Sequence, residues 1–352
     1  MSRQLFLDLA RRKLRMPIGA DLVLHEKSDA PAILRDGKRL GAVLAEAATR
    51  YDTPLAIPLM DLTLEKGALL AMLGIAAADA ATYHFEHDIT QDMLERVHSG
   101  LSGTLDGNTQ VHVDAVRFVA AQKNLVPVGL VIGPFSLMTK MLADPITPVY
   151  LAGEGVTAAE DPEVARVERA LQMAEWIIHR SITRQLAAGA KVIMVAEPAA
   201  NVAFISPKQM AAGADVWRRY VIEPNLRLRQ LLTAAQVELI FHCCGELCEP
   251  MLRGFTQLQP ALLSLGSSRR LWEDAAIVPK DIVLYGNLPT KQFYSDRVIT
   301  LPEVERQTRD LIGRMGETGH PFILGSECDV LTVAGCECVI REKVRAMLNC
   351  VM

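Results

Sequence analysis

A histidine and a cysteine stand two positions apart, at His242 and Cys244, at the end of the largely apolar run 237–241. If this run is a strand, side chains two residues apart point to the same face of the sheet, so the imidazole and the thiol lie together. Another thiol, Cys328, follows the apolar run 321–324. If both runs belong to one barrel, three soft ligands meet at one rim. A catalytic zinc site takes this number of ligands from the protein and keeps its fourth position open.

The chemistry of such a site follows from its charge. Zinc held by two thiolates and one neutral imidazole carries no net charge. A substrate thiolate at the fourth position makes the centre anionic, and its sulfur stays nucleophilic although it is deprotonated well below the usual thiol pKa of about 8.5. This suits methyl transfer to a thiol better than hydrolysis, which favours a more electrophilic zinc that acidifies water. In the reverse direction the metal acts as a Lewis acid on a methyl donor.

Apolar runs alternate with helical segments along most of the chain. Boundary signals such as N-cap residues followed by proline predict helices at 2–15, 40–51, 162–188 and 300–315. Eight strands are predicted, the second of them from a weaker signal: 54–60, 81–85, 126–132, 192–196, 237–242, 261–265, 282–285 and 321–324. Near-continuous apolar strands separated by helices indicate a parallel sheet covered on both faces. We therefore predict an α/β fold, a single (β/α)8 TIM barrel over 1–352 in which 1–53 form an N-terminal helical extension.

Other polar residues fall at or just after predicted strand ends, where barrel enzymes place their chemistry. Glu197 follows the run 192–196, and a carboxylate there is costly unless it meets a partner or solvent in a cleft. We predict a catalytic role for Glu197, with a structural acid as the alternative. Asp61 and Asn287 are predicted to bind substrate, although Asp61 equally suits a helix cap. Phe135 is a further candidate for substrate contact, although its Gly-Pro-Phe segment also suits a tight turn.

The composition excludes several classes of protein. The 352-residue chain has a net charge of −4, which offers no basic face for nucleic acid or for an anionic membrane. No stretch reaches the roughly 18 uninterrupted apolar residues of a membrane span, and residues 1–15 lack the apolar core of a signal peptide. Seven cysteines, an odd number, do not suit a disulfide framework. We expect a cytoplasmic protein with reduced thiols, whose partners are small molecules or proteins.

Several segments carry a family resemblance. They are Gly-Pro-Phe-Ser-Leu at 133–137, Ala-Glu-Pro at 196–198, Ile-Ser-Pro at 205–207, His-Cys-Cys-Gly at 242–245, Gly-Asn at 286–287 and Gly-Ser-Glu-Cys-Asp at 325–329. With them the chain resembles the uroporphyrinogen decarboxylase superfamily, and within it the zinc-dependent, corrinoid-linked methyltransferases such as the methylcobalamin:coenzyme M enzymes. The resemblance implies zinc held by His242, Cys244 and Cys328, and a methyl group exchanged with a corrinoid (cobalamin) carrier. The sequence contains no Asp-x-His-x-x-Gly cobalt-ligand segment, so we expect the corrinoid on a separate partner protein.

Two positions depart from the family's pattern. The family usually has an aspartate where Glu197 stands, and many relatives carry an acidic residue after the serine that corresponds to Ser264, where this chain has Leu265. The arginine-rich segment that decarboxylases use for porphyrinogen carboxylates is not recognisable around 35–61, which counts against decarboxylation.

Some alternatives stay open. The protein is either such a methyltransferase, a decarboxylase that acts on a polycarboxylate, or a non-catalytic zinc protein that binds a corrinoid partner. Cys248, four residues beyond Cys244, is an alternative ligand. Cys243 is expected to face away from the site and to pack in the core.

Overall fold

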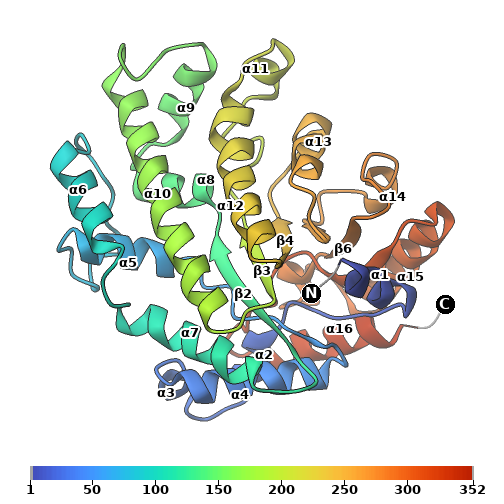
Figure 1. Ribbon diagram of the computed structural model, residues 1–352. Helices are drawn as coiled ribbons and strands as arrows, with labels where there is room; N and C mark the ends of the chain where they lie inside the picture. The colour runs from blue at the N-terminus through green and yellow to red at the C-terminus, as the bar shows by residue number, and fades with distance from the viewer. Residues whose placement is uncertain (1–2, 351–352) are drawn as a thin grey trace.

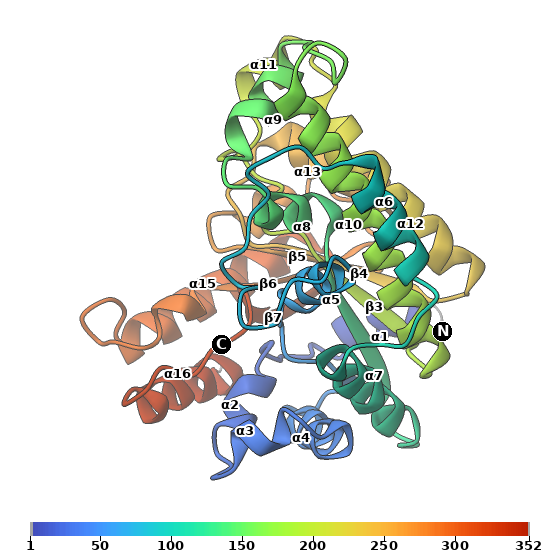
Figure 2. The same cartoon turned by 90° about the vertical axis from the view of Figure 1, so that its left-hand side faces the viewer.

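The computed structural model describes residues 3–350. This part of the chain contains one curled sheet of seven strands, which follow each other in chain order and pair in parallel throughout (Figures 1 and 2). The strands are β1 (Leu55–Ala56), β2 (Val126–Ile132), β3 (Val192–Ala196), β4 (Glu238–Cys243), β5 (Leu262–Leu265), β6 (Val283–Leu288) and β7 (Phe322–Ser326). Helical segments connect them, so the fold is of the TIM-barrel type that the alternation predicts.

Sixteen α-helices, one π-helix and one 3-10 helix lie in the described residues. They are α1 (Gln4–Arg11), α2 (Ala20–Leu24), α3 (Ala30–Ile33), α4 (Gly37–Arg50), α5 (Leu64–Met72), α6 (Gln91–Gly100), α7 (Gly107–Ala120), α8 (Pro134–Met141), α9 (Ile146–Gly153), α10 (Pro162–Ala187), α11 (Pro207–Ala211), the π-helix η1 (Arg218–Ile222), α12 (Glu223–Ala234), α13 (Glu249–Gln257), α14 (Leu271–Asp274), the 3-10 helix η2 (Thr290–Gln292), α15 (Leu301–Thr318) and α16 (Glu337–Asn349). Among the described helices, none is long and apolar enough to cross a membrane.

Alternate residues of the strands divide between two hydrophobic cores. Met194 and Ile240 belong to an inner core that also contains Phe6 of α1. Residues of the opposite parity, such as Ile193 and Phe241, pack with the surrounding helices in a larger outer core. Because side chains alternate along a strand, this division fixes which residues at each strand end face inward.

Most of the predicted strands and helices are confirmed, with shifted bounds. The first strand is reduced from 54–60 to the two residues of β1, since Pro54 and Pro58 lack the N–H groups that a longer ladder needs. The helix predicted at 162–188 is α10, whose N-cap Asp161 accepts hydrogen bonds from two backbone N–H groups. The helix predicted over 2–15 ends earlier, at Arg11.

The second predicted strand, at 81–85, is not a strand in the structure. Residues 79–83 form turns, and Phe85 makes one isolated bridge with Leu142. The alanine-rich segment before residue 81 continues into local turn hydrogen bonds. A short strand needs a neighbouring sheet edge to pair with, and without one it does not replace these turns. The prediction was therefore wrong at this segment.

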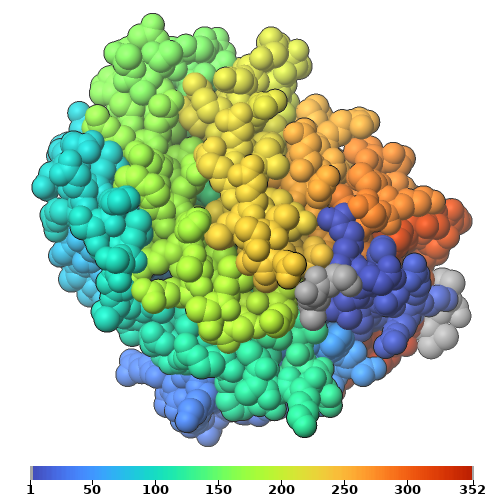
Figure 3. All heavy atoms as spheres, viewed as in Figure 1, coloured from blue at the N-terminus to red at the C-terminus, as the bar shows by residue number. Residues whose placement is uncertain are grey.

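The edge of β7 is occupied instead by the chain between α1 and α2. Arg15 and Ile18 form parallel bridges with Leu324 and Asp329, and the N–H of Met16 donates to the carbonyl of Leu324 at 3.0 Å. In the space-filling view the N-terminal residues, in blue, lie beside the orange and red C-terminal third (Figure 3). Part of 1–53, predicted to be a helical extension, thus contacts the sheet directly.

Candidate metal centre

His242 lies near the end of β4 with its side chain fully buried. It stands two residues after Ile240 and therefore faces inward. The register places it opposite Ser264 on β5, and the Ser264 hydroxyl lies 2.8 Å from His242 Nδ1. The other ring nitrogen, Nε2, has no hydrogen-bond partner among the described residues. A buried nitrogen without a partner is costly, so Nε2 is free to bind a metal ion while Ser264 orients the ring.

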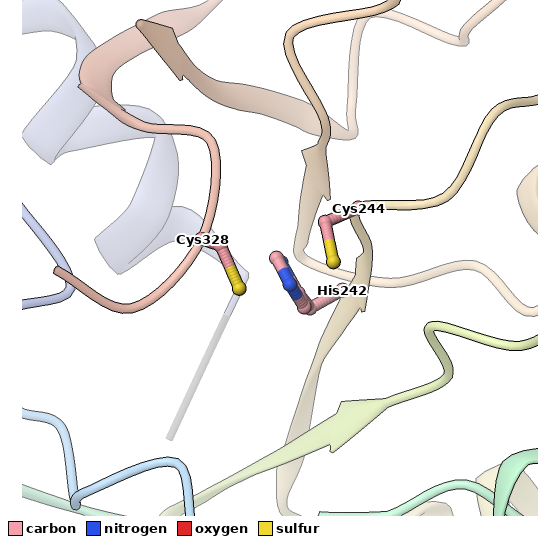
Figure 4. Close-up of side chains that lie close together, drawn as sticks. All are labelled: His242, Cys244 and Cys328. Carbon is pink, nitrogen blue, oxygen red and sulfur yellow. The ribbon is translucent and has the colours of Figure 1, made fainter. Parts of the chain in front are cut away.

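Two cysteines bring their sulfur atoms to the same place (Figure 4). Cys244 directly follows β4, and Cys328 lies in the loop after β7; both are half-buried. One ligand atom from each of His242, Cys244 and Cys328 lies within 4.8 Å of the other two. Tetrahedral zinc with Zn–S bonds of about 2.3 Å holds its sulfur ligands roughly 3.8 Å apart. The three side chains therefore have to close only slightly around an ion, and one nitrogen with two sulfurs is a donor set that suits zinc.

Charges around the two sulfurs favour a thiolate at Cys244. The hydrogen bond from the Cys328 thiol lowers the pKa of Cys244 to about 3, and His242 and Lys291 act in the same direction against the effect of burial. The same hydrogen bond raises the pKa of Cys328. Burial by itself lowers the pKa of Lys291, but the nearby Cys244, Cys328 and Glu327 raise it overall. An ammonium group therefore lies beside the sulfurs and balances negative charge there.

Two glycines allow the surrounding loops to approach the ligands. A Cβ atom at Gly266, after β5, would lie 2.6 Å from the carbonyl oxygen of Cys244. At Gly245 it would lie 2.6 Å from Cβ of Asn201 in the loop after β3. Real Cβ atoms do not approach other atoms so closely, so a side chain at Gly266 would push against the backbone of Cys244, and one at Gly245 would push against Asn201.

Glu327, next to Cys328, joins three loops at this rim. Its Oε2 accepts a hydrogen bond from the Ser267 hydroxyl at 2.6 Å, and its Oε1 accepts one from the backbone N–H of Lys291 at 3.2 Å. Its own N–H donates to the carbonyl of Leu288 at 2.9 Å. The loops after β5, β6 and β7 are thereby held together, which fixes Cys328 relative to the rest of the cluster.

Comparison with known proteins gives the chain a family. Residues 20–351 match the family model described as uroporphyrinogen decarboxylase (URO-D). The chain belongs to the URO-D family. No curated protein matches the sequence. Among solved structures, a methyltransferase from Methanosarcina mazei is similar to this chain, with 14% sequence identity and a TM-score of 0.66, over 99% of this chain and 98% of that one. At this identity the likeness shows a shared fold.

Glu197 is satisfied by hydrogen bonds from the protein and not by solvent in a cleft. Its carboxylate is fully buried. Oε1 accepts a hydrogen bond from the N–H of Ser136 at 2.6 Å, at the start of α8, and Oε2 accepts one from the amide of Asn225 on α12 at 2.9 Å. Burial raises the pKa of Glu197, although the hydrogen bonds oppose this. In this structure the carboxylate joins α8 to α12, which is the structural alternative; a catalytic role for Glu197 stays a prediction.

The three predicted substrate-binding residues lie in different settings. Asp61 is half-buried and its Oδ1 accepts hydrogen bonds from the backbone and hydroxyl of Thr63, as a residue at a helix start does. The side-chain amide of Asn287 donates to the carbonyls of Gly266 and Arg269, so it braces the loop after β5. Phe135 is fully buried on α8. Asp61 does not belong to the group of ligand atoms around His242, and contact of all three residues with substrate stays a prediction.

The neighbouring cysteines separate as their spacing predicts. Cys243 is buried in the outer core, and its thiol donates to the carbonyl of Ala200 at 3.5 Å, so it faces away from His242. Cys248 is half-buried and precedes α13. Among the described residues, the grouping of ligand atoms includes Cys244 and Cys328 but not Cys248.

Sequence reasoning missed the residues that support the ligands. The family pattern draws attention to Leu265, the residue after Ser264, although the position of Ser264 two residues before Gly266 on an apolar strand already places Ser264 at the rim. Glu327 and Lys291 were not singled out as site residues. The available signal for Glu327 is its charge directly beside the predicted ligand Cys328. No local pattern identifies Lys291.

Proposed function

We propose that this protein is a zinc-dependent methyltransferase. It moves a methyl group between a separate corrinoid protein and a small thiol or methyl donor that binds at zinc. The observation that carries the proposal is the convergence of His242, Cys244 and Cys328, together with the partnerless Nε2 of the buried imidazole. The name of the Methanosarcina mazei neighbour, a methyltransferase, supports the reaction type.

Zinc, when bound, lowers the pKa of a substrate thiol and keeps its sulfur nucleophilic, or polarises a methyl donor in the reverse direction. The residues of this chain set the conditions for that chemistry. Ser264 holds the His242 ring so that Nε2 faces the two sulfurs. Lys291 supplies a positive charge beside Cys244 and Cys328, which offsets the negative charge that a substrate thiolate adds.

Residues around the cluster are assigned supporting roles in the proposal. Asp61 and Asn287 border the substrate, and Asn287 also keeps the Gly266 loop against Cys244. Phe135 supports the site by packing as a buried residue of α8. Glu197 fixes α8, and its backbone N–H donates to the carbonyl of His242 at 2.8 Å; in the proposal it contributes to catalysis by positioning β4.

The test combines metal analysis with a spectroscopic assay. Protein purified without added metal is expected to contain one zinc per chain. Methylcob(III)alamin is then mixed with candidate thiols, and cob(I)alamin with candidate methyl donors, while the cobalamin absorbance is followed. A spectral change that requires zinc supports the proposal. The assay is repeated with a cognate corrinoid protein, because free cobalamin lacks the carrier's contacts.

Because the family is named after a decarboxylase, the test also covers decarboxylation. Carbon dioxide released from a polycarboxylate, with no transfer from the cognate carrier, would replace the proposal by a decarboxylase. Tightly bound zinc with neither reaction, and with its fourth position blocked by protein, would indicate a non-catalytic zinc protein.

A further inference from the structure

A third sulfur atom, that of Met60, lies beside the candidate ligand Cys328. We propose that the thioether of Met60 occupies the fourth coordination position of the resting metal and is displaced by the substrate thiol. This inference rests on the proposed zinc site, because it concerns the same ion.

The distance between sulfur atoms supports the assignment. Met60 Sδ lies 3.9 Å from Cys328 Sγ. Two sulfur ligands of one tetrahedral zinc are separated by roughly 3.8 Å, which follows from a Zn–S bond of about 2.3 Å and the tetrahedral angle. The two sulfurs are therefore already at the spacing of neighbouring ligands. Thioether sulfur is a soft donor of the kind that accompanies thiolates in metal sites.

The backbone holds Met60 in register with Cys328. Met60 lies in the loop after β1, and its N–H donates to Oδ2 of Asp329 at 3.1 Å. Asp329 directly follows Cys328 and is only 6% exposed. Its neighbour Val330 is tied by its N–H to the carbonyl of Ile18 at 2.7 Å. The loop that presents Cys328 thus also holds the backbone of Met60.

The chemistry of a thioether suits a ligand that leaves. Met60 is neutral, so it adds no charge to a centre that already has two thiolates, and it binds more weakly than a thiolate does. With zinc bound, an incoming thiol would give its proton to solvent and its sulfur would take the place of the Met60 sulfur, which would leave with its own lone pair. A side chain that is half-buried can make this movement without unfolding the loop.

The decisive experiment uses the natural sequence with selenium in place of methionine sulfur. Protein grown with selenomethionine at all 14 methionines is loaded with zinc, and the zinc-edge X-ray absorption spectrum is recorded with and without a small thiol. A selenium neighbour in the first shell of zinc is expected without thiol, and its loss is expected with thiol. Zinc bound without a selenium neighbour would overturn the proposal for Met60 and leave the three-ligand site intact. Absence of bound zinc would instead reject the proposed function.

Variants then assign the selenium signal to one residue. Met60→Leu is expected to lose the selenium neighbour and to keep one zinc per chain. Met93→Leu, a change of the same kind on α6, is expected to retain it. If the thioether is bound in about nine of ten molecules, Met60→Leu also binds the thiol about tenfold more tightly. A selenium signal that persists in Met60→Leu would assign the ligand to another methionine.

Discussion

Two buried polar groups at the ends of neighbouring strands differ in how their atoms are satisfied. Glu197, after β3, accepts hydrogen bonds at both carboxylate oxygens. His242, on β4, has one ring nitrogen bonded to Ser264 and the other without a partner. Both side chains have no exposed surface. The difference separates a carboxylate whose two oxygens are satisfied within the fold from an imidazole with one nitrogen left for the metal ion proposed above.

The largest effect that tests this comparison is the loss of a sulfur ligand. Cys328→Ser and Cys244→Ser are each expected to lower the zinc content from one per chain to nearly none, because a hydroxyl replaces a thiolate that the ion prefers. Cys338→Ser, an exposed cysteine outside the ligand cluster, is the control and should keep its zinc. Elemental analysis measures all three. Unchanged zinc in both ligand variants would reject the site, and zinc retained only in Cys244→Ser would point to Cys248.

A smaller loss of zinc binding is expected when the hydroxyl of Ser264, the hydrogen-bond partner of His242, is removed. Ser264→Ala leaves the three ligands in place but frees the imidazole ring to rotate. Removal of such a partner typically weakens metal binding by about 10- to 100-fold. Competition with a chelator of known affinity measures the change. Equal zinc affinity in Ser264→Ala and the natural protein would show that the hydroxyl does not orient the ring.

Glu197→Gln should leave the metal unaffected and alter only stability. Gln keeps one acceptor for the Ser136 N–H but presents an amide to Asn225, so the free energy of unfolding should fall by about 1–2 kcal/mol at acidic pH. Zinc content should equal that of the natural protein. Urea unfolding and metal analysis on the same preparation separate the two outcomes. Loss of zinc without loss of stability would return Glu197 to a direct role in the site.

The smallest expected effect is in the pH dependence of stability. Burial raises the pKa of Glu197, so the folded protein keeps its proton at pH values where the unfolded chain has lost it. The free energy of unfolding therefore decreases as pH rises from the ordinary glutamate pKa of about 4.5 through the raised one. Glu65 and Asp329, whose pKa values burial raises to about 7, contribute in the same direction in both proteins.

The difference between the natural protein and Glu197→Gln isolates one carboxyl group. Over this pH range the natural protein should lose more stability than the variant. Urea unfolding at several pH values from 4 to 8 measures the two curves. Parallel curves would mean that Glu197 titrates equally in the folded and unfolded states.

The sequence was sufficient to predict that the three candidate ligands meet at one rim, because each lies at or just after the end of an apolar run, and strand periodicity places side chains on a face. The structure brings His242, Cys244 and Cys328 together as that reasoning expects. The pairing of His242 with Ser264 depends on the register between β4 and β5, which no local pattern specifies. The burial of Glu197 likewise depends on where α8 begins and how α12 packs.

The missing eighth strand shows a related limit. The segment 81–85 has an apolar character that predicts a strand, but the edge of β7 is filled by residues distant in sequence. Leu14, Met16 and Ile18 do alternate with more polar or proline positions, which is a strand signal. The prediction of one helix over 2–15 covers part of this segment and does not take the alternation into account.

Docking of the segment around Ile18 beside β7 has a consequence for the order of folding. The N–H of Ile18 donates to the hydroxyl of Ser326, two residues before Cys328, across a sequence separation of 308 residues. Contacts this distant close the longest loops and form slowly. The open edge of β7 is exposed until they form, and exposed edges promote aggregation. If the proposed zinc site forms during folding, an ion that draws Cys328 toward His242 and Cys244 would hold β7 in the sheet earlier, and omission of zinc during expression should lower the yield of soluble protein.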